Sequence, residues 1–178
     1  LVYTPESDED ALNICKQLFQ SMNSATQPIF PTMAEQVVAA VMIYYMRTFW
    51  RYNQSKLNNK ELVNFFMYNT NDNLRDIFSL DYMKDHRNCI DYISMEGGQT
   101  QGVKSYIGSV MEEMFIGPFA QSDTSKEFSM RDIMCGGKKK VIFIEYDLRK
   151  GNILSPMYGI LIDCALSNAL GGRNKKKT

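Results

Sequence analysis

The sequence predicts a mainly α-helical bundle with one C-terminal β-strand followed by a helix. Apolar residues recur at helical spacing over most of residues 1–137, which is typical of amphipathic helices. A continuous β-branched and aromatic run, Val141 to Ile144, is instead typical of a strand covered on both faces in a parallel sheet. Because no other segment looks able to pair with this strand, we expect its sheet to lie in polypeptide outside this sequence, in a larger α/β protein.

The composition is that of an ordinary globular protein. The chain has 178 residues, of which 44% are hydrophobic and 22% charged, so it is long enough to bury a sizeable core. Its 20 basic and 20 acidic residues cancel, so no global field recruits nucleic acid or an anionic membrane, although a local basic face stays open. The cysteines are interpreted as free buried thiols in a reducing compartment; they are Cys15, Cys89, Cys135 and Cys164.

A first helix is expected from about Ser7, where a polar cap is followed by acids that favour the positive end of the helix dipole. Pro28 and Pro31 then indicate a linker, because the residue before a proline disfavours helix. The longest helix is expected from Met33 to about Asn53, and its nearly all-round apolar surface predicts the central helix of a bundle. Its apolar run, Val37 to Met46, is about half of a bilayer span, so we expect a core helix.

Shorter helices are predicted before the strand, each bounded by turn residues or paired glycines. They cover Lys60 to Tyr68, Leu74 to Phe78, Asp81 to Ile93, about Thr100 to Phe115, and Ser129 to Met134. The last helix is expected to hold Pro156 near its start and to close at Gly171-Gly172. We therefore divide the chain into an all-α domain at 1–137, a strand and helix at 138–172, and a basic tail at 173–178. The first residues lack an initiator methionine and a signal-peptide pattern, so we expect a piece of a longer protein.

The segment Gly97 to Ser105 approximates a phosphate-binding loop. That loop needs a glycine followed directly by lysine and then by serine or threonine, and here Val103 separates Gly102 from Lys104. A helix-helix connection followed by a helix start explains the segment better than nucleotide binding does. His86 is the only histidine and lacks partners for a zinc site, and no nucleophile-and-base pattern occurs. We therefore expect no catalytic, cofactor or metal site in this chain.

Cations alternate with aromatic residues at the end of the longest helix. Such a surface holds single-stranded nucleic acid by phosphate contact and base stacking. The pattern alone favours a second interpretation, in which the rings belong to the core and the arginine stems lie along it. The candidate contacts with DNA or a partner are Arg47, Trp50, Arg51, Lys56 and Lys60, with Tyr52 among them in sequence.

Several stretches resemble type IV secretion coupling proteins, the DNA-transfer ATPases of conjugative elements. The most specific are 141–148, 151–158 and 162–166; Ser129 to Asp132, Met114 to Phe119 and the acidic opening helix fit the same order. The resemblance implies an all-α domain inserted into a RecA-like nucleotide domain, to which the strand and helix at 138–172 return. The sequence departs from a complete ATPase because it lacks a valid phosphate-binding loop, and the family's magnesium carboxylate would lie beyond Thr178.

The resemblance implies a non-catalytic domain that recognises substrate. Its expected partners are a relaxase or relaxosome accessory protein, a secreted protein, or single-stranded DNA. ATP and magnesium are expected in the parent protein and not in this chain. The parent is expected to be a membrane-anchored homohexamer, bound to the secretion channel at the cytoplasmic face of the bacterial cell membrane. The alternative is a free-standing helical regulatory or DNA-binding domain.

Overall fold

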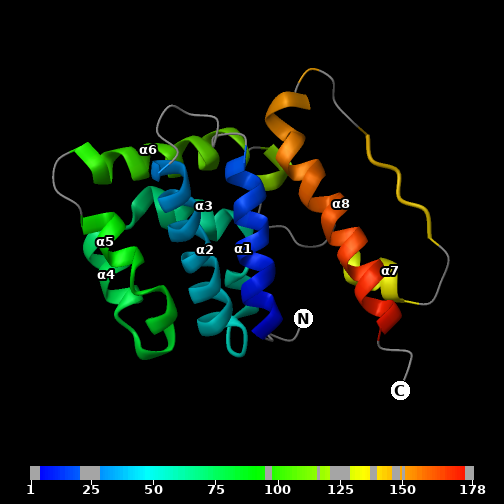
Figure 1. Ribbon diagram of the computed structural model, residues 1–178, viewed down its shortest axis with the longest axis horizontal. Helices are drawn as coiled ribbons and strands as arrows, with labels where there is room; N and C mark the ends of the chain where they lie inside the picture. The colour runs from blue at the N-terminus through cyan, green and yellow to red at the C-terminus, as the bar shows by residue number, and fades with distance from the viewer. Residues whose placement is uncertain are drawn as a thin grey trace. The chain divides into compact units, whose positions relative to one another are not determined.

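The computed structural model describes residues 5–20, 29–94, 98–115, 117–120, 129–136, 140–145, 149 and 151–174. These residues are mainly helical, and none of them forms a strand (Figure 1). The chain divides into two compact units, Leu1–Ser122 and Asp123–Thr178. The mainly α-helical class predicted from the sequence is therefore confirmed.

The unit Leu1–Ser122 is built from helices and short 3-10 turns. In chain order they are α1 (Pro5–Gln20), α2 (Ile29–Phe49), η1 (Gln54–Lys56), α3 (Asn59–Tyr68), α4 (Asn71–Phe78), η2 (Asp81–His86), α5 (Cys89–Ser94), α6 (Gly98–Glu113) and η3 (Gly117–Ala120). In Figure 1, α1 and α2 run side by side, and α6 lies across them.

Helix α2 is the core helix of this unit, as the sequence predicted. Val37 to Val41 and Ile43 are fully buried, and α2 packs against α1, α5 and α6. It begins four residues earlier than expected, because Pro31 lies in the first turn, where a missing amide breaks no helical hydrogen bond. Among the described residues, α2 is the one helix long and apolar enough to cross a membrane, a test that a core helix also meets.

Phe30 and Gly102 form a close contact between α2 and α6. A Cβ atom at position 102 would lie 3.3 Å from the Phe30 ring, tighter than ordinary van der Waals contact. Glycine therefore lets the ring sit against the α6 backbone. The buried residues of α6 recur three and four positions apart, so they lie on one helix face; they are Val103, Ile107, Val110 and Met111.

The short helices follow from local capping. Asn58 caps α3 by accepting a hydrogen bond from the Glu61 amide at 2.9 Å, and Thr70 caps α4 by accepting from the Asn73 amide at 3.3 Å. The single helix predicted from Asp81 to Ile93 is instead two elements, η2 and α5, separated by the turn at 87–88. Both elements still contribute to the core, because Met83 of η2 and Cys89 and Ile93 of α5 are buried.

The unit Asp123–Thr178 contains α7 (Met130–Cys135), capped by Ser129, and α8 (Gly151–Asn174), which packs on α7. The contacts thus group α7 with α8, whereas the sequence pattern predicts that residues 129–134 belong to the all-α domain at 1–137. Helix α8 contains Pro156, as expected, but it continues through Gly171-Gly172, which were expected to end it.

The predicted strand at Val141 to Ile144 is absent from the structure. Residues 140–145 form neither helix nor strand, and Val141 and Phe143 are 78% and 92% exposed. A strand requires hydrogen bonds from a neighbouring strand, and the described part of the chain offers none. The segment thus keeps the apolar composition of a buried strand while its side chains face solvent.

Candidate functional site

Arg47 is tied into the interior of Leu1–Ser122. Its guanidinium forms an ion pair with the Asp8 carboxylate on α1 and donates to the main-chain oxygen of Tyr82 in η2. Asp85 lies at the edge of this cluster, with its Oδ2 atom 4.0 Å from Arg47 Nη2, the nitrogen that pairs with Asp8. Through these contacts Arg47 joins α1, α2 and η2, and its side chain is only 17% exposed. Its predicted contact with DNA or a partner stays a prediction.

The residues that follow α2 are more open to solvent. Trp50 is partly buried, Arg51 is exposed, and Tyr52 is 87% exposed. Arg51 makes no ion pair with any other described residue. An exposed cation next to an exposed ring is the combination that phosphate contact and base stacking require.

Lys56 and Lys60 lie on either side of the Asn58 cap. The Lys56 Nζ atom is 2.8 Å from Glu61 Oε2, and the two side chains are 43% and 30% exposed. Lys60 is exposed and forms no ion pair within the described part of the chain. The charge of Lys56 is therefore matched by a carboxylate, whereas no described carboxylate pairs with the exposed Lys60.

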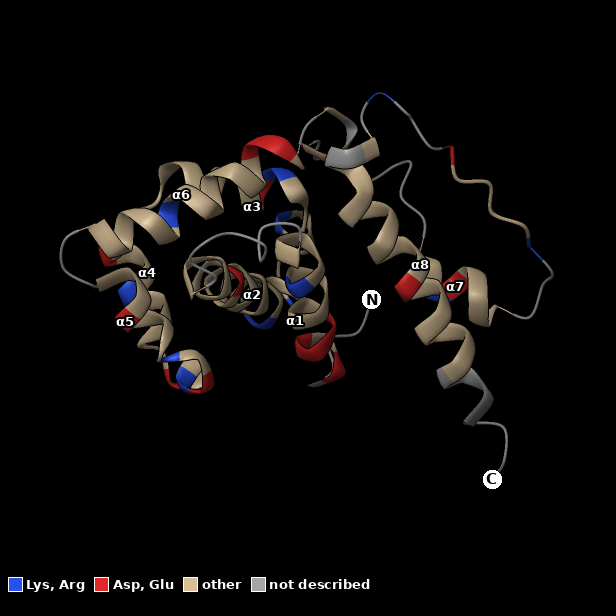
Figure 2. Ribbon diagram, turned by 45° about the horizontal axis from the view of Figure 1, so that its top comes forward, with Lys and Arg blue, Asp and Glu red and all other residues tan. Residues whose placement is uncertain are grey.

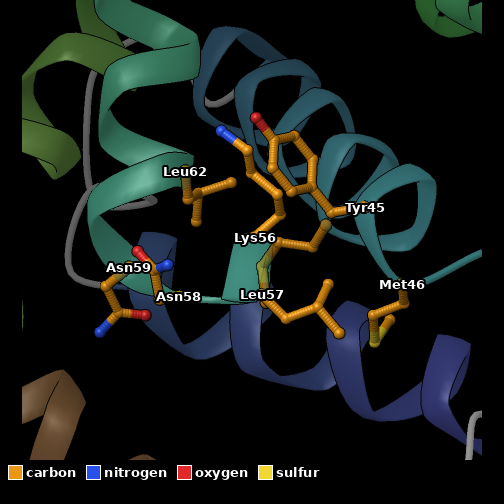
Figure 3. Close-up of a pocket in the computed structure, with 8 residues that line it drawn as sticks. Tyr45, Met46, Lys56, Leu57, Asn58, Asn59 and Leu62 are labelled. Atoms are coloured by element: carbon orange, nitrogen blue, oxygen red, sulfur yellow. The ribbon is translucent and has the colours of Figure 1, made fainter. Parts of the chain in front are cut away.

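A pocket of about 180 Å³ lies where α2, η1 and α3 meet, and we call it the junction pocket. Figure 3 shows the Tyr45 side chain of α2 beside Lys56, with Leu62 of α3 facing them. The lining residues are Met42, Tyr45, Met46, Lys56, Leu57, Asn58, Asn59 and Leu62. One predicted contact residue, Lys56, thus lines this pocket, and Lys60 directly follows another lining residue, Asn59.

The Tyr45 phenol is neutral at physiological pH. Burial, together with the nearby Glu61 carboxylate and Tyr44, raises the pKa of Tyr45 to about 12. Its hydroxyl lies 3.5 Å from the Glu61 main-chain oxygen, at the long limit of a hydrogen bond. The junction pocket therefore combines an uncharged aromatic wall with one lysine.

Basic and acidic residues are interspersed over the helices of Leu1–Ser122 (Figure 2). This agrees with the net charge of zero over the whole chain. Long-range attraction of a polyanion is accordingly weak, so recognition of nucleic acid depends on local cations such as Arg51 and Lys60.

The segment that approximates a phosphate-binding loop lies in a helix from Gly98 onward, while Gly97 lies outside the described residues. Val103 is buried and Lys104 is exposed on α6.

His86 is half-buried in η2. Burial, with a smaller contribution from Arg47, lowers the pKa of His86, while Asp8 and Asp85 act in the opposite direction. No cluster of three or more metal-ligating side chains occurs among the residues that the structure describes.

The cysteines are free, as predicted, but they differ in exposure. Cys15 and Cys89 are buried, and burial raises the pKa of both thiols, that of Cys89 to about 12. Cys164 is partly buried, and Cys135 is exposed. The prediction of a buried thiol is therefore wrong for Cys135, which is the last residue of α7, a helix with no buried residue.

Sequence reasoning missed Asp8 as the partner of Arg47 and missed the junction pocket. The contact between Arg47 and Asp8 joins residues 39 positions apart and leaves no local signal in the sequence. The junction pocket has a partial signal, because an N-cap followed three residues later by glutamate marks a helix start, as Asn58 and Glu61 do here. That pattern fixes the start of α3, but it does not predict that Tyr45 would lie across from it.

In its described residues, the chain is a helical domain with a small apolar pocket, exposed cations and exposed aromatic residues beside them. A family model described as the type IV secretion-system coupling protein DNA-binding domain matches residues 4–178. The chain therefore belongs to this family, which confirms the resemblance noted in its sequence. Neither the curated proteins nor the solved structures contained a match to the chain.

Proposed function

We propose that this chain is a substrate-recognition domain of a type IV secretion coupling protein and that it binds single-stranded DNA without catalysing a reaction. The observation that carries the proposal is the surface between α2 and α3. There Arg51 and Lys60 are exposed and make no ion pair with other described residues, and Tyr52 is 87% exposed. The family to which the chain belongs is described as a DNA-binding domain, which supports the same function.

The binding is expected to be weak and dependent on salt. The chain has no net charge, so affinity depends on a few phosphate contacts that release counterions. The test is fluorescence anisotropy of a labelled single-stranded oligonucleotide titrated with the 178-residue chain at several salt concentrations. The logarithm of the association constant should fall linearly with the logarithm of salt concentration. Absence of binding even at low salt would overturn the proposal.

A second surface fits protein cargo such as a relaxase or a relaxosome accessory protein. A pocket of about 220 Å³ is lined by residues of α3 to α6, among them Phe66, Met67 and Lys104. Met67 is 55% exposed, and the adjacent Tyr68 is 81% exposed. Large exposed apolar and aromatic side chains beside a concave surface are typical of protein contacts.

The proposal extends to the parent protein, a membrane-anchored hexameric ATPase that holds ATP and magnesium in a RecA-like domain. The exposed apolar side chains at 141–144 support this placement, because a parallel sheet would bury them. Helix α8 also exposes Ile162, Leu166 and Leu170 at a spacing of four residues, so they lie on one helix face.

The reading frame of the gene distinguishes this proposal from a free-standing helical regulator. It should continue beyond both ends of the sequence, with a phosphate-binding loop upstream and an acidic strand downstream. A stop codon directly after Thr178 would contradict the larger ATPase and favour the free-standing domain.

A further inference from the structure

We propose that the junction pocket accepts one unstacked base of single-stranded DNA. This inference rests on the proposed function and adds a defined site to it. The pocket measures about 180 Å³. Apolar protein cavities of about 150 Å³ bind benzene, so the volume suits a flat aromatic ring.

The walls of the pocket have the chemistry that binds aromatic rings. Tyr45 contributes a neutral ring, and bases stack on such rings regardless of sequence. Met42 and Met46 contribute thioethers, which make favourable contacts with aromatic rings and adapt to their shape. Leu57 and Leu62 complete an apolar enclosure from η1's end and from α3.

The charges around the pocket favour a nucleotide over a neutral apolar side chain. Lys56 lines the pocket, and its ion pair with Glu61 cancels the carboxylate that would otherwise repel a phosphate. Lys60 and Arg51 bring two exposed cations to the same connection between α2 and α3. An apolar pocket with Lys56 in its wall, and with Lys60 next in sequence to the lining residue Asn59, complements a base attached to its charged backbone.

The test uses the full chain with methionine methyl groups labelled with carbon-13, and two oligonucleotides of about 12 nucleotides. One is an oligodeoxyadenylate, and the other has the same backbone with every base removed. Ring current from an inserted adenine should shift the Met42 and Met46 methyl signals. Met67 and Met134, which are 55% and 40% exposed, are internal controls that should not move.

Affinity provides the second readout. The abasic oligonucleotide should bind roughly 5- to 150-fold more weakly, because it cannot stack a base in the pocket. Leu57→Trp, which fills the pocket from its wall, should weaken binding of the oligodeoxyadenylate toward the abasic level, and the difference that remains measures stacking on the exposed Tyr52. Leu80→Trp, at a 37% exposed position that does not line the pocket, should leave the binding unchanged. Equal binding of both oligonucleotides with unmoved Met42 and Met46 signals would overturn the pocket and leave the proposed function intact. Failure of both to bind at low salt would overturn the two together.

Discussion

The Arg47 guanidinium on α2 pairs with the Asp8 carboxylate on α1 across 39 positions of sequence. The same guanidinium donates to the Tyr82 carbonyl in η2, so three elements meet at one cation. An arginine that the sequence predicts to contact DNA therefore also holds the bundle together. Arg47 and Arg51, four residues apart, occupy different environments and serve as a matched pair for experiments.

Arg47→Ala should destabilise the unit Leu1–Ser122 by about 1.5–3 kcal/mol, because it removes hydrogen bonds to a charged group from a mostly buried site. Arg51→Ala should change the free energy of unfolding by less than about 0.5 kcal/mol, since Arg51 is exposed. Urea unfolding followed by circular dichroism measures both. Equal effects of the two substitutions would contradict the assignment of Arg47 to the interior.

Charge reversal at the two exposed cations should weaken DNA binding without unfolding the protein. The salt slope is the slope of the logarithm of the association constant against the logarithm of salt concentration. Arg51→Glu combined with Lys60→Glu should reduce the magnitude of this slope for single-stranded DNA by about 0.7 for each phosphate that is no longer neutralised. Anisotropy titrations at several salt concentrations measure the slope. Lys16→Glu combined with Lys84→Glu, two exposed reversals on α1 and η2, is the control for net charge. If the control lowers the slope as much as the double variant does, the surface between α2 and α3 is not the binding site.

His86 should make the protein less stable as the pH falls below about 6.5. Burial and the Arg47 charge lower the pKa of His86 in the folded chain, so the unfolded chain takes up the proton first. The free energy of unfolding therefore falls as the pH drops from the ordinary histidine pKa to the lowered pKa of the folded chain. Below the lowered pKa, this contribution of His86 falls no further. Urea midpoints across this range measure the effect. His86→Gln should flatten this part of the pH profile, and an unchanged profile would show that other groups cause it.

Two glycines of α6 should respond differently to alanine. Nothing lies within 4 Å of a Cβ atom built at Gly108, so Gly108→Ala should stabilise the helix by up to about 1 kcal/mol. At Gly102 the new methyl group meets the Phe30 ring at 3.3 Å, so Gly102→Ala should gain clearly less or lose stability. Thermal unfolding of the two variants tests this difference, and an equal gain at both positions would argue against the Phe30 contact.

ATP with magnesium should not bind to this chain. In a phosphate-binding loop the lysine stands at the start of a helix, whereas Lys104 lies well inside α6, where the main-chain amides are bonded within the helix. Isothermal titration calorimetry should therefore detect no heat of binding. Micromolar affinity would instead support an enzymatic role for the segment from Gly98 to Ser105.

Local signals accounted for the helices and not for the tertiary contacts. Asn58, Thr70 and Ser129 cap helices close to where the sequence predicted them to begin, because a cap acts within a few residues. The apolar surface of α2 predicted its central place, since burial follows from composition. No strand forms at 140–145, because a strand pairs with a segment distant in sequence, and the sequence predicts that this partner lies outside the chain.

The candidate site was predicted in part. The alternation of cations and aromatics located the connection between α2 and α3, where Arg51, Tyr52 and Lys60 are exposed. It did not separate Arg47, whose partner Asp8 lies on another helix, from these exposed residues. The junction pocket also depends on how three elements pack together, and periodicity within one helix carries no information about such a cavity.

The unequal burial of the cysteines gives the chain a built-in attachment point for probes. Thiol reagents attack the thiolate, which the raised pKa values of Cys15 and Cys89 suppress at neutral pH. Cys135 is exposed on α7, so a maleimide dye should mark Asp123–Thr178 and leave Leu1–Ser122 unmodified. Cys164→Ser would confine the label to one position. Energy transfer from Trp50, the only tryptophan, to that dye would then report the separation of the two units in solution as DNA is added.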